Sequence, residues 1–206
     1  MGEKKDKKYK LYEYKDDDGN FSYDMYKDIQ VKTNKKKLER VWVKKESIEI
    51  LCKEFPNAKR VLCHGTRRGK EQEFFKDFLD CYAIGTEISD TAESFPDTIE
   101  WDFHNVKEEW VNSFDIVYSN SFDHSYKPEE CLKAWVECIK DDGVVVLEFQ
   151  NRGHGIHSLS ASDPFACQRD DMPEFINECG EGKFYFERQF KSHGKHTYFL
   201  IIKKTI

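Results

Sequence analysis

The chain has 206 residues, of which 35% are charged and 38% hydrophobic, and its formal net charge is -6 at pH 7. This length predicts one domain with a short extension, and the 4 Trp, 10 Tyr and 16 Phe residues can anchor a core, which excludes a disordered chain. No apolar run approaches the roughly 20 residues of a membrane span, and the first residues do not resemble a signal peptide.

The cysteines and the distribution of charge restrict the possible classes of protein further. The seven cysteines include no CxxC pair and mostly lie in apolar segments, which favours free buried thiols in the cytoplasm and disfavours a zinc site. Residues 1–45 carry 14 Lys and Arg against 9 Asp and Glu, whereas residues 46–206 carry 19 against 30. Because nucleic-acid binding depends on neutralising phosphates, the acidic main part predicts no nucleic-acid partner, and the basic start predicts a solvated arm.

Residues 1–45 are predicted to form a basic and aromatic extension, and residues 46–206 the main domain. In the extension, aromatic residues alternate around an Asp-Gly turn, and residues 23–34 have the composition of a short helix. Residues 46–55 have helical spacing that Pro56 ends.

Apolar strands alternate with helices from residue 60 onward, which predicts an α/β fold with a parallel sheet covered on both faces. The expected strands are 60–64, 81–88, 98–103, 114–120 and 143–149, and the expected helices are 70–79, 105–112 and 128–140. Two further strands, 182–190 and 195–204, are joined by a connection too short for a parallel crossover. They are therefore predicted to be antiparallel.

A glycine turn follows the first of these strands, in the segment VLCHGTRRG. Gly65 and Gly69 suit a turn that holds a cofactor, but Arg67 occupies the place where a glycine lets the backbone approach a pyrophosphate. Glu87 follows the next strand about 20 residues later, where a carboxylate can accept both hydroxyls of a ribose. A ribose without a pyrophosphate indicates S-adenosylmethionine, whose single carboxylate an arginine or backbone N–H groups can meet.

Four segments occur in a recurring order: the glycine turn, AIGTEIS, EWDFHNV, and the run 114–149. In this order they resemble the class I (Rossmann-like) S-adenosylmethionine-dependent methyltransferases over residues 46–206, with Cys63 at the place of the first motif's acid. The resemblance implies a seven-stranded, mostly parallel sheet with an antiparallel last strand beside the fifth and helices on both faces. It also implies a set of cofactor-binding residues: His64, Gly65, Arg67, Gly69, Glu87, Ile88, Asp102, Phe103 and Asn120.

The loop after the fourth strand is expected to face the reacting centre. Methyl transfer mainly requires alignment of the acceptor, and an alcohol acceptor must also lose a proton to a base. His124 is the candidate base, and Asp123 is a candidate for a substrate hydrogen bond or a metal ligand, although no metal is expected. Tyr126, His154 and His157 are predicted to contact the acceptor, the two histidines from a polar, Gly-rich loop at 151–165.

The predicted acceptor is a hydroxyl of a sugar or another small molecule, because the candidate loops offer short polar groups and aromatic faces. Phenols, protein side chains and nucleotide-linked sugars stay open, as does the oligomeric state. The alternatives for the whole chain are an NAD-dependent oxidoreductase and a non-catalytic protein that binds S-adenosylmethionine.

Overall fold

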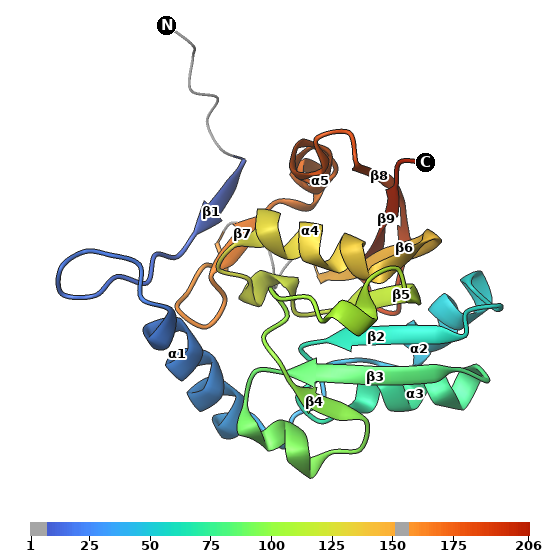
Figure 1. Cartoon of the computed structure of the whole chain (residues 1–206), viewed down its shortest axis with the longest axis horizontal. Helices are drawn as coiled ribbons and strands as arrows, with labels where there is room; N and C mark the ends of the chain where they lie inside the picture. Colours follow the sequence, from blue (N-terminus) through green and yellow to red (C-terminus); the bar gives the residue numbers. More distant parts are fainter. Residues whose placement is uncertain (1–7, 151–156) are drawn as a thin grey trace, which may run out of the picture.

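The computed structural model of the chain describes residues 8–150 and 157–206 (Figure 1). Seven strands form one sheet in the order β4–β3–β2–β5–β6–β9–β8. The first five in this order are parallel, and β9 lies antiparallel between β6 and β8. The predicted fold class is therefore confirmed, including the last strand beside the fifth expected one. The strands are β2 (Arg60–His64), β3 (Tyr82–Glu87), β4 (Thr98–Glu100), β5 (Phe114–Ser119), β6 (Ile139–Gln150), β8 (Phe184–Lys191) and β9 (Thr197–Lys204).

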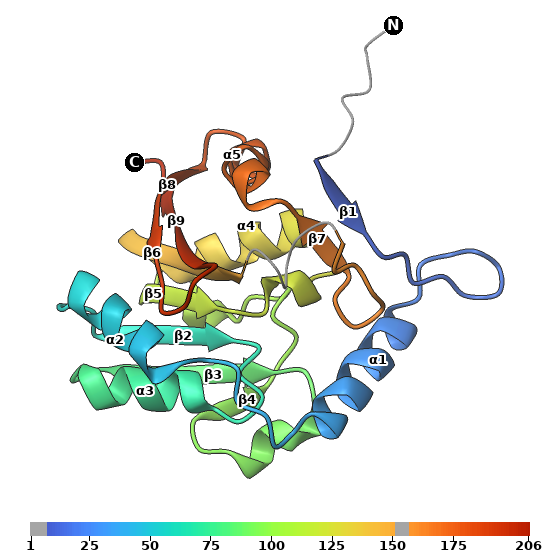
Figure 2. The same cartoon turned by 180° about the vertical axis from the view of Figure 1, so that it is seen from behind.

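Helices cover both faces of the sheet, as the apolar strands require (Figures 1 and 2). Side chains alternate along each strand: Leu62 packs in the cluster beneath one helical layer, whereas Val61 and Cys63 pack beneath the other. The first layer consists of α4 (Pro128–Cys138) and α5 (Met172–Gly180), and the second of α2 (Lys45–Glu54) and α3 (Lys70–Phe78).

The prediction of a helix at 105–112 was wrong, because only a short 3-10 turn (Glu108–Trp110) forms there. Asp102 accepts the backbone N–H of His104, which fixes a turn just before the segment. Asn112 adopts a positive φ of 49° and donates its backbone N–H to Glu137, which ends the segment. Both ends are therefore tied into turns, and the buried Trp110 is positioned without a helix.

The N-terminal segment packs against the main part through a second, two-stranded sheet. β1 (Tyr9–Leu11) pairs antiparallel with β7 (Phe165–Cys167), a strand that the sequence did not predict. The expected helix is confirmed as α1 (Tyr23–Lys36), which begins where the Ser22 hydroxyl accepts the N–H of Met25. In Figure 1, α1 lies beside the ends to which the arrows of β2 and β3 point, which are their carboxyl ends. The domain boundary at residue 45 stays a prediction.

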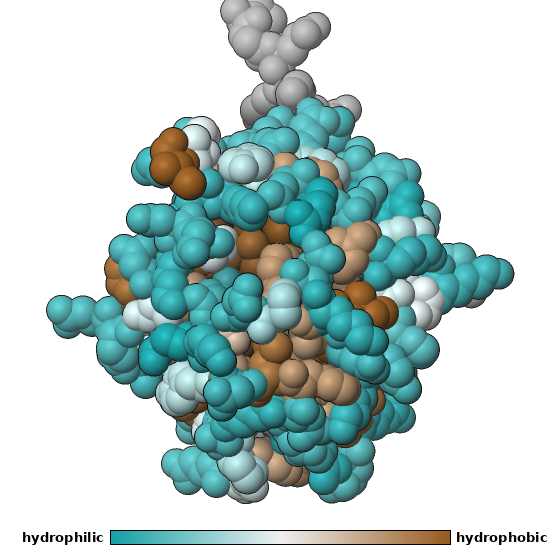
Figure 3. Space-filling model, turned by 90° about the vertical axis from the view of Figure 1, so that its right-hand side faces the viewer, coloured by the Kyte–Doolittle hydropathy of each residue, from teal (hydrophilic) through white to brown (hydrophobic). Residues whose placement is uncertain are grey.

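The distribution of polar side chains on the surface and the burial of the cysteines are those of a folded domain. Figure 3 shows a face on which hydrophilic residues surround a group of apolar ones. All seven cysteines are free thiols, and six of them are buried, as predicted. Among the residues described, no helix is long and apolar enough to cross a bilayer.

Candidate functional site

The glycine turn after β2 is tight and uses the left-handed backbone region three times. Gly65, Arg67 and Gly69 have φ values of 73°, 45° and 71°. A Cβ on Gly65 would lie 2.8 Å from the Cβ of Ser121, and one on Gly69 would lie 2.7 Å from Nε2 of Gln72. Glycine is therefore favoured at both positions by the left-handed backbone, and at Gly65 also because Ser121 in the loop after β5 leaves no room for a Cβ.

Glu87 connects this turn to the end of β3. Its side chain accepts the backbone N–H of Arg67 at 3.0 Å and that of Ser89 at 3.3 Å. Burial raises the pKa of this carboxyl above its ordinary value, although the two N–H groups oppose the shift. The acid that was predicted to hold a ribose therefore lies directly beside the glycine turn.

The ends of four strands, β2 to β5, and the loops after them meet in one small cavity of about 50 Å³, the loop after β5 through Ser121 and His124. Of the predicted cofactor-binding residues, Gly65, Arg67, Glu87, Ile88, Asp102 and Phe103 line it. The remaining wall is α1, which contributes Tyr26, Gln30, Thr33 and Asn34. Ligand pockets usually enclose roughly 300–1,000 Å³, so a nucleoside does not fit within this cavity alone.

The contribution of α1 was missed in the sequence. Tyr26, Gln30 and Asn34 are its buried residues, and they recur every four positions, so they share one face of the helix. Two polar side chains on the buried face of a short helix were the available signal, since buried polar groups need specific partners.

Asp102 is held as a carboxylate in this cavity. It accepts hydrogen bonds from the Tyr23 hydroxyl at 2.8 Å and from the backbone N–H of His104, whose Nδ1 lies 2.7 Å from it. Burial disfavours the charged form, but the interactions with His104 and Tyr23 outweigh it, and the pKa of Asp102 is lowered. Asp102 therefore keeps its acceptor capacity where the adenine amine is predicted.

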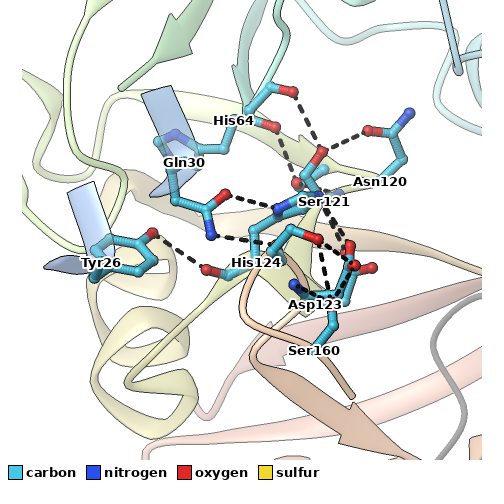
Figure 4. A network of polar contacts seen from close by, with 12 residues as sticks. Tyr26, Gln30, His64, Asn120, Ser121, Asp123, His124 and Ser160 are labelled. Carbon is cyan, nitrogen blue, oxygen red and sulfur yellow. Dashed lines mark hydrogen bonds and ion pairs between the residues drawn. The ribbon is translucent and has the colours of Figure 1, made fainter. Parts of the chain in front are cut away.

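The orientation of His124 follows from its hydrogen bonds (Figure 4). Gln30 donates from Nε2 to the carbonyl of Ser162 at 3.2 Å, so its Oε1 is the atom that faces Nδ1 of His124, at 3.0 Å. An oxygen acceptor at this distance places the hydrogen on Nδ1. The Nε2 atom then faces Asp123 and Asp163, whose nearest oxygens lie 4.0 and 3.8 Å away.

Asp163 is itself fixed by two hydroxyls. Ser160 and Ser162 each donate to its Oδ2 at 2.8 Å. Burial opposes its ionisation, but His124 and the two serines outweigh this and lower its pKa. Ligand atoms of Asp123, His124 and Asp163 lie within 4.8 Å of one another, so these residues could also hold a divalent cation. The expectation that no metal is needed stays a prediction.

A larger cleft of about 630 Å³ adjoins the small cavity and shares Gly65, Arg67, Ser121 and His124 with it. Asn120, Asp123 and Asp163 also line this cleft. The predicted loop after β5 therefore faces an open space beside the predicted cofactor residues, which is the arrangement that transfer between two ligands requires.

Four other predicted residues line neither cavity, and one of them is Gly69, which lies at the start of α3. The His64 ring is buried, stacks on Trp135 at 4.8 Å, and lines neither of the two cavities. Burial lowers its pKa to about 3. Tyr126 stacks on Phe21 at 5.1 Å instead of lining the cleft, and His157 is exposed. His154 lies outside the described residues.

Glu71, in the first turn of α3, is a titratable residue that was missed. It lines the larger cleft but is only 5% exposed, and burial raises its pKa to about 8. The signal was its position just after the glycine turn, at the carboxyl ends of the strands. Near neutral pH the protonated, uncharged form is therefore favoured.

We expect Glu71→Gln to raise the free energy of unfolding by about 1–3 kcal/mol at pH 8 and to change it little near pH 4.5. The folded state keeps a proton that the unfolded state loses, so the stability of the natural protein falls between about pH 4.5 and 8. Urea denaturation at both pH values measures this difference. Glu108→Gln, at an exposed position, is the control. If the variant is less stable than the natural protein at both pH values, Glu71 is not buried in its protonated form.

The sheet order, the glycine turn and the acid after β3 together give the fold of the class I S-adenosylmethionine-dependent methyltransferases, as the sequence resemblance predicted. No protein-family model matches the sequence, and no curated protein matches it.

Solved structures confirm this fold at low sequence identity. The mitomycin 7-O-methyltransferase MmcR has a TM-score of 0.64 at 12% identity; the match covers 78% of this chain and 53% of MmcR, so the chain spans about half of that protein. A 1,6-didemethyltoxoflavin-N1-methyltransferase from Burkholderia thailandensis, with bound S-adenosylhomocysteine, has a TM-score of 0.60 at 15% identity and coverages of 78% and 77%. A protein from Rhodobacter sphaeroides proposed to be a Zn-dependent alcohol dehydrogenase has a TM-score of 0.64 at 9% identity and coverages of 90% and 100%.

Proposed function

We propose that the protein transfers a methyl group from S-adenosylmethionine to a hydroxyl group of a sugar or another small molecule. The observation that carries this proposal is the position of His124 Nε2, which faces a cleft adjoining the cavity that Glu87 and the glycine turn line. A base next to a nucleoside-type site is what O-methylation needs.

The residues around the small cavity fit the cofactor. Glu87 would accept the ribose hydroxyls, Asp102 the adenine amine, and Ile88 and Phe103 would contact the ring. The Arg67 guanidinium, which lines both cavities, would meet the carboxylate. When bound, the cofactor supplies an electrophilic methyl group on a sulfonium.

The side chains of the larger cleft would orient the acceptor and remove its proton. His124 accepts the hydroxyl proton at Nε2, because Nδ1 already carries a hydrogen directed at Gln30. Asp123 and Asp163 lie near enough to stabilise the resulting imidazolium. Asn120 and Ser121 offer further hydrogen bonds to a hydroxyl-rich molecule.

Two of the similar structures are O-methyltransferases, which supports an oxygen acceptor, and one of them was solved with S-adenosyl-L-homocysteine. A hydride-transferring enzyme would place a pyrophosphate at the turn, where Arg67 now stands. A non-catalytic cofactor-binding protein would need no oriented histidine beside the cavity.

Calorimetric titration is the first test. We expect S-adenosylmethionine and S-adenosylhomocysteine to bind and NAD not to bind, because the Arg67 side chain replaces the glycine that a pyrophosphate requires. Tighter binding of NAD than of S-adenosylmethionine would contradict the proposal.

Incubation with labelled S-adenosylmethionine and a panel of sugars, nucleotide-linked sugars, phenols, peptides and RNA then tests the acceptor. We expect label in the sugar fractions. Label only in RNA or peptide would overturn the sugar hydroxyl and keep the methyltransferase activity.

A further inference from the structure

The larger cleft is basic, although the chain as a whole has a net charge of -6. Seven Lys and Arg residues line it, against four Asp and Glu residues. Burial favours the neutral form of Glu71, so at most three of these acids place a negative charge in the cleft; one of the three, Glu148, accepts hydrogen bonds from the hydroxyls of Tyr118 and Ser192. The cleft is thus positive on an acidic protein.

Only two of these cations form an ion pair within the described part of the chain, although Lys37 also interacts electrostatically with Asp163, and Arg67 with Glu71 and Glu87. Arg68 pairs with Glu39 at 2.8 Å and Lys70 with Glu73 at 2.6 Å. The other five form no ion pair with any residue in the described part of the chain; they are Lys37, Arg40, Lys44, Arg67 and Lys195. Against these five cations stand the carboxylate of the cofactor and the side chains of Asp123, Asp163 and Glu148, so the cleft keeps a net positive charge for a second ligand.

The unpaired cations come from three separate segments. Lys37, Arg40 and Lys44 belong to the connection between α1 and α2, Arg67 to the glycine turn, and Lys195 to the turn between β8 and β9. Like charges brought together by different parts of the fold repel one another, and a bound anion removes this repulsion. Their convergence on one cleft therefore favours an anionic ligand.

Trp42 adds an aromatic face to the same cleft. Its side chain lies between Arg40 and Lys44 in the sequence and is 58% exposed, which is unusual for so large an apolar group. An exposed indole beside cations can stack on a sugar ring or a base while the cations hold a phosphate.

Resting on the methyltransferase function proposed above, we propose that the acceptor is a phosphate-bearing sugar. Lys37, Arg40, Lys44 and Lys195 hold its phosphate, the ring of the acceptor lies on Trp42, and a sugar hydroxyl reaches His124. The charges lie within a concave cleft and the remaining surface is acidic, so a small phosphorylated molecule fits better than RNA. A sugar phosphate and a nucleotide-linked sugar share this chemistry.

Binding measurements with S-adenosylhomocysteine present test the proposal without turnover. The probes are glucose, glucose 1-phosphate, UDP-glucose and a 20-nucleotide RNA. We expect the phosphorylated sugars to bind at least about 10-fold more tightly than glucose and to weaken as salt rises. Tighter binding of UDP-glucose than of glucose 1-phosphate would identify the acceptor as a nucleotide-linked sugar. Tighter binding of glucose 1-phosphate would identify it as a simple sugar phosphate.

The double variant Arg40→Gln, Lys44→Gln is expected to weaken binding of the phosphorylated sugars at least about 10-fold, and Trp42→Ala to weaken it separately. Neither should change the affinity for S-adenosylhomocysteine. The matched control is Lys32→Gln, Lys53→Gln, which removes two exposed lysines that do not line the cleft. Glucose binding as tightly as its phosphates, or RNA binding more tightly than either, would overturn the inference. If the natural protein does not bind S-adenosylhomocysteine, the proposed function itself is overturned.

Discussion

Replacing His124 with Asn or Ala is expected to lower turnover by about 100-fold or more and to leave cofactor affinity nearly unchanged. The ring is oriented for proton transfer, because Gln30 fixes the hydrogen on Nδ1 and leaves Nε2 facing the cleft. No other hydrogen bond described for His124 ties it to the glycine turn or to Glu87. Formation of S-adenosylhomocysteine in single-turnover and steady-state assays measures the loss, and calorimetry measures the affinity.

Two controls separate a base from its alternatives. Lys53→Ala changes an exposed residue that lines neither cavity and should leave turnover unchanged. Chelator treatment should also have no effect if Asp123, His124 and Asp163 act without a metal. Near-normal turnover of the His124 variants would contradict the base, and activity lost to chelator and restored by magnesium would assign these three residues to a metal site.

Replacing Glu87 with Ala is expected to weaken binding of S-adenosylmethionine by about 1–3 kcal/mol, because charged hydrogen bonds to the ribose are lost. The substitution also removes the acceptor for the N–H groups of Arg67 and Ser89, so a folded control is needed. Glu87→Gln keeps one acceptor oxygen, which can serve only one of these N–H groups because they contact different carboxylate oxygens, and it should lose less affinity than Ala. Unchanged affinity in both variants, with unchanged thermal stability, would place the ribose elsewhere.

The parts of the fold that depend on local periodicity could be predicted from the sequence. β2 and β5 are buried apolar runs between turn residues, and they lie within one residue of the expected ranges. The helix predicted at 105–112 does not form because a local turn at Asp102 precedes the segment and a tertiary hydrogen bond to Glu137 ends it, and these override its helical composition. β7 was missed because a strand of three residues is too short to show a periodic pattern in the sequence. Its partner, β1, lies about 155 residues away in the chain.

The candidate site could be predicted as far as it lies at strand ends. Parallel strands bring their carboxyl ends to one edge, so Gly65, Glu87 and Asp102 had to lie close together. The burial of His64 follows from the alternation of side chains along β2. His64 points to the same face as Leu62 and packs under α4, so the prediction that it binds the cofactor did not take this alternation into account. The role of α1 could not be predicted, since the direction in which a terminal helix folds back depends on contacts far away in the sequence.

The position of α1 has a kinetic consequence. One helix closes the cavity predicted for the nucleoside and, through Gln30, holds the ring of His124. An outward movement of α1 that enlarges this cavity for a nucleoside would also take away the partner that fixes the tautomer of the histidine. On the proposed function, we therefore expect cofactor exchange and proton acceptance by His124 to alternate. We expect an ordered reaction cycle in which the cofactor binds first, its product leaves last, and the opening of α1 limits the rate of exchange.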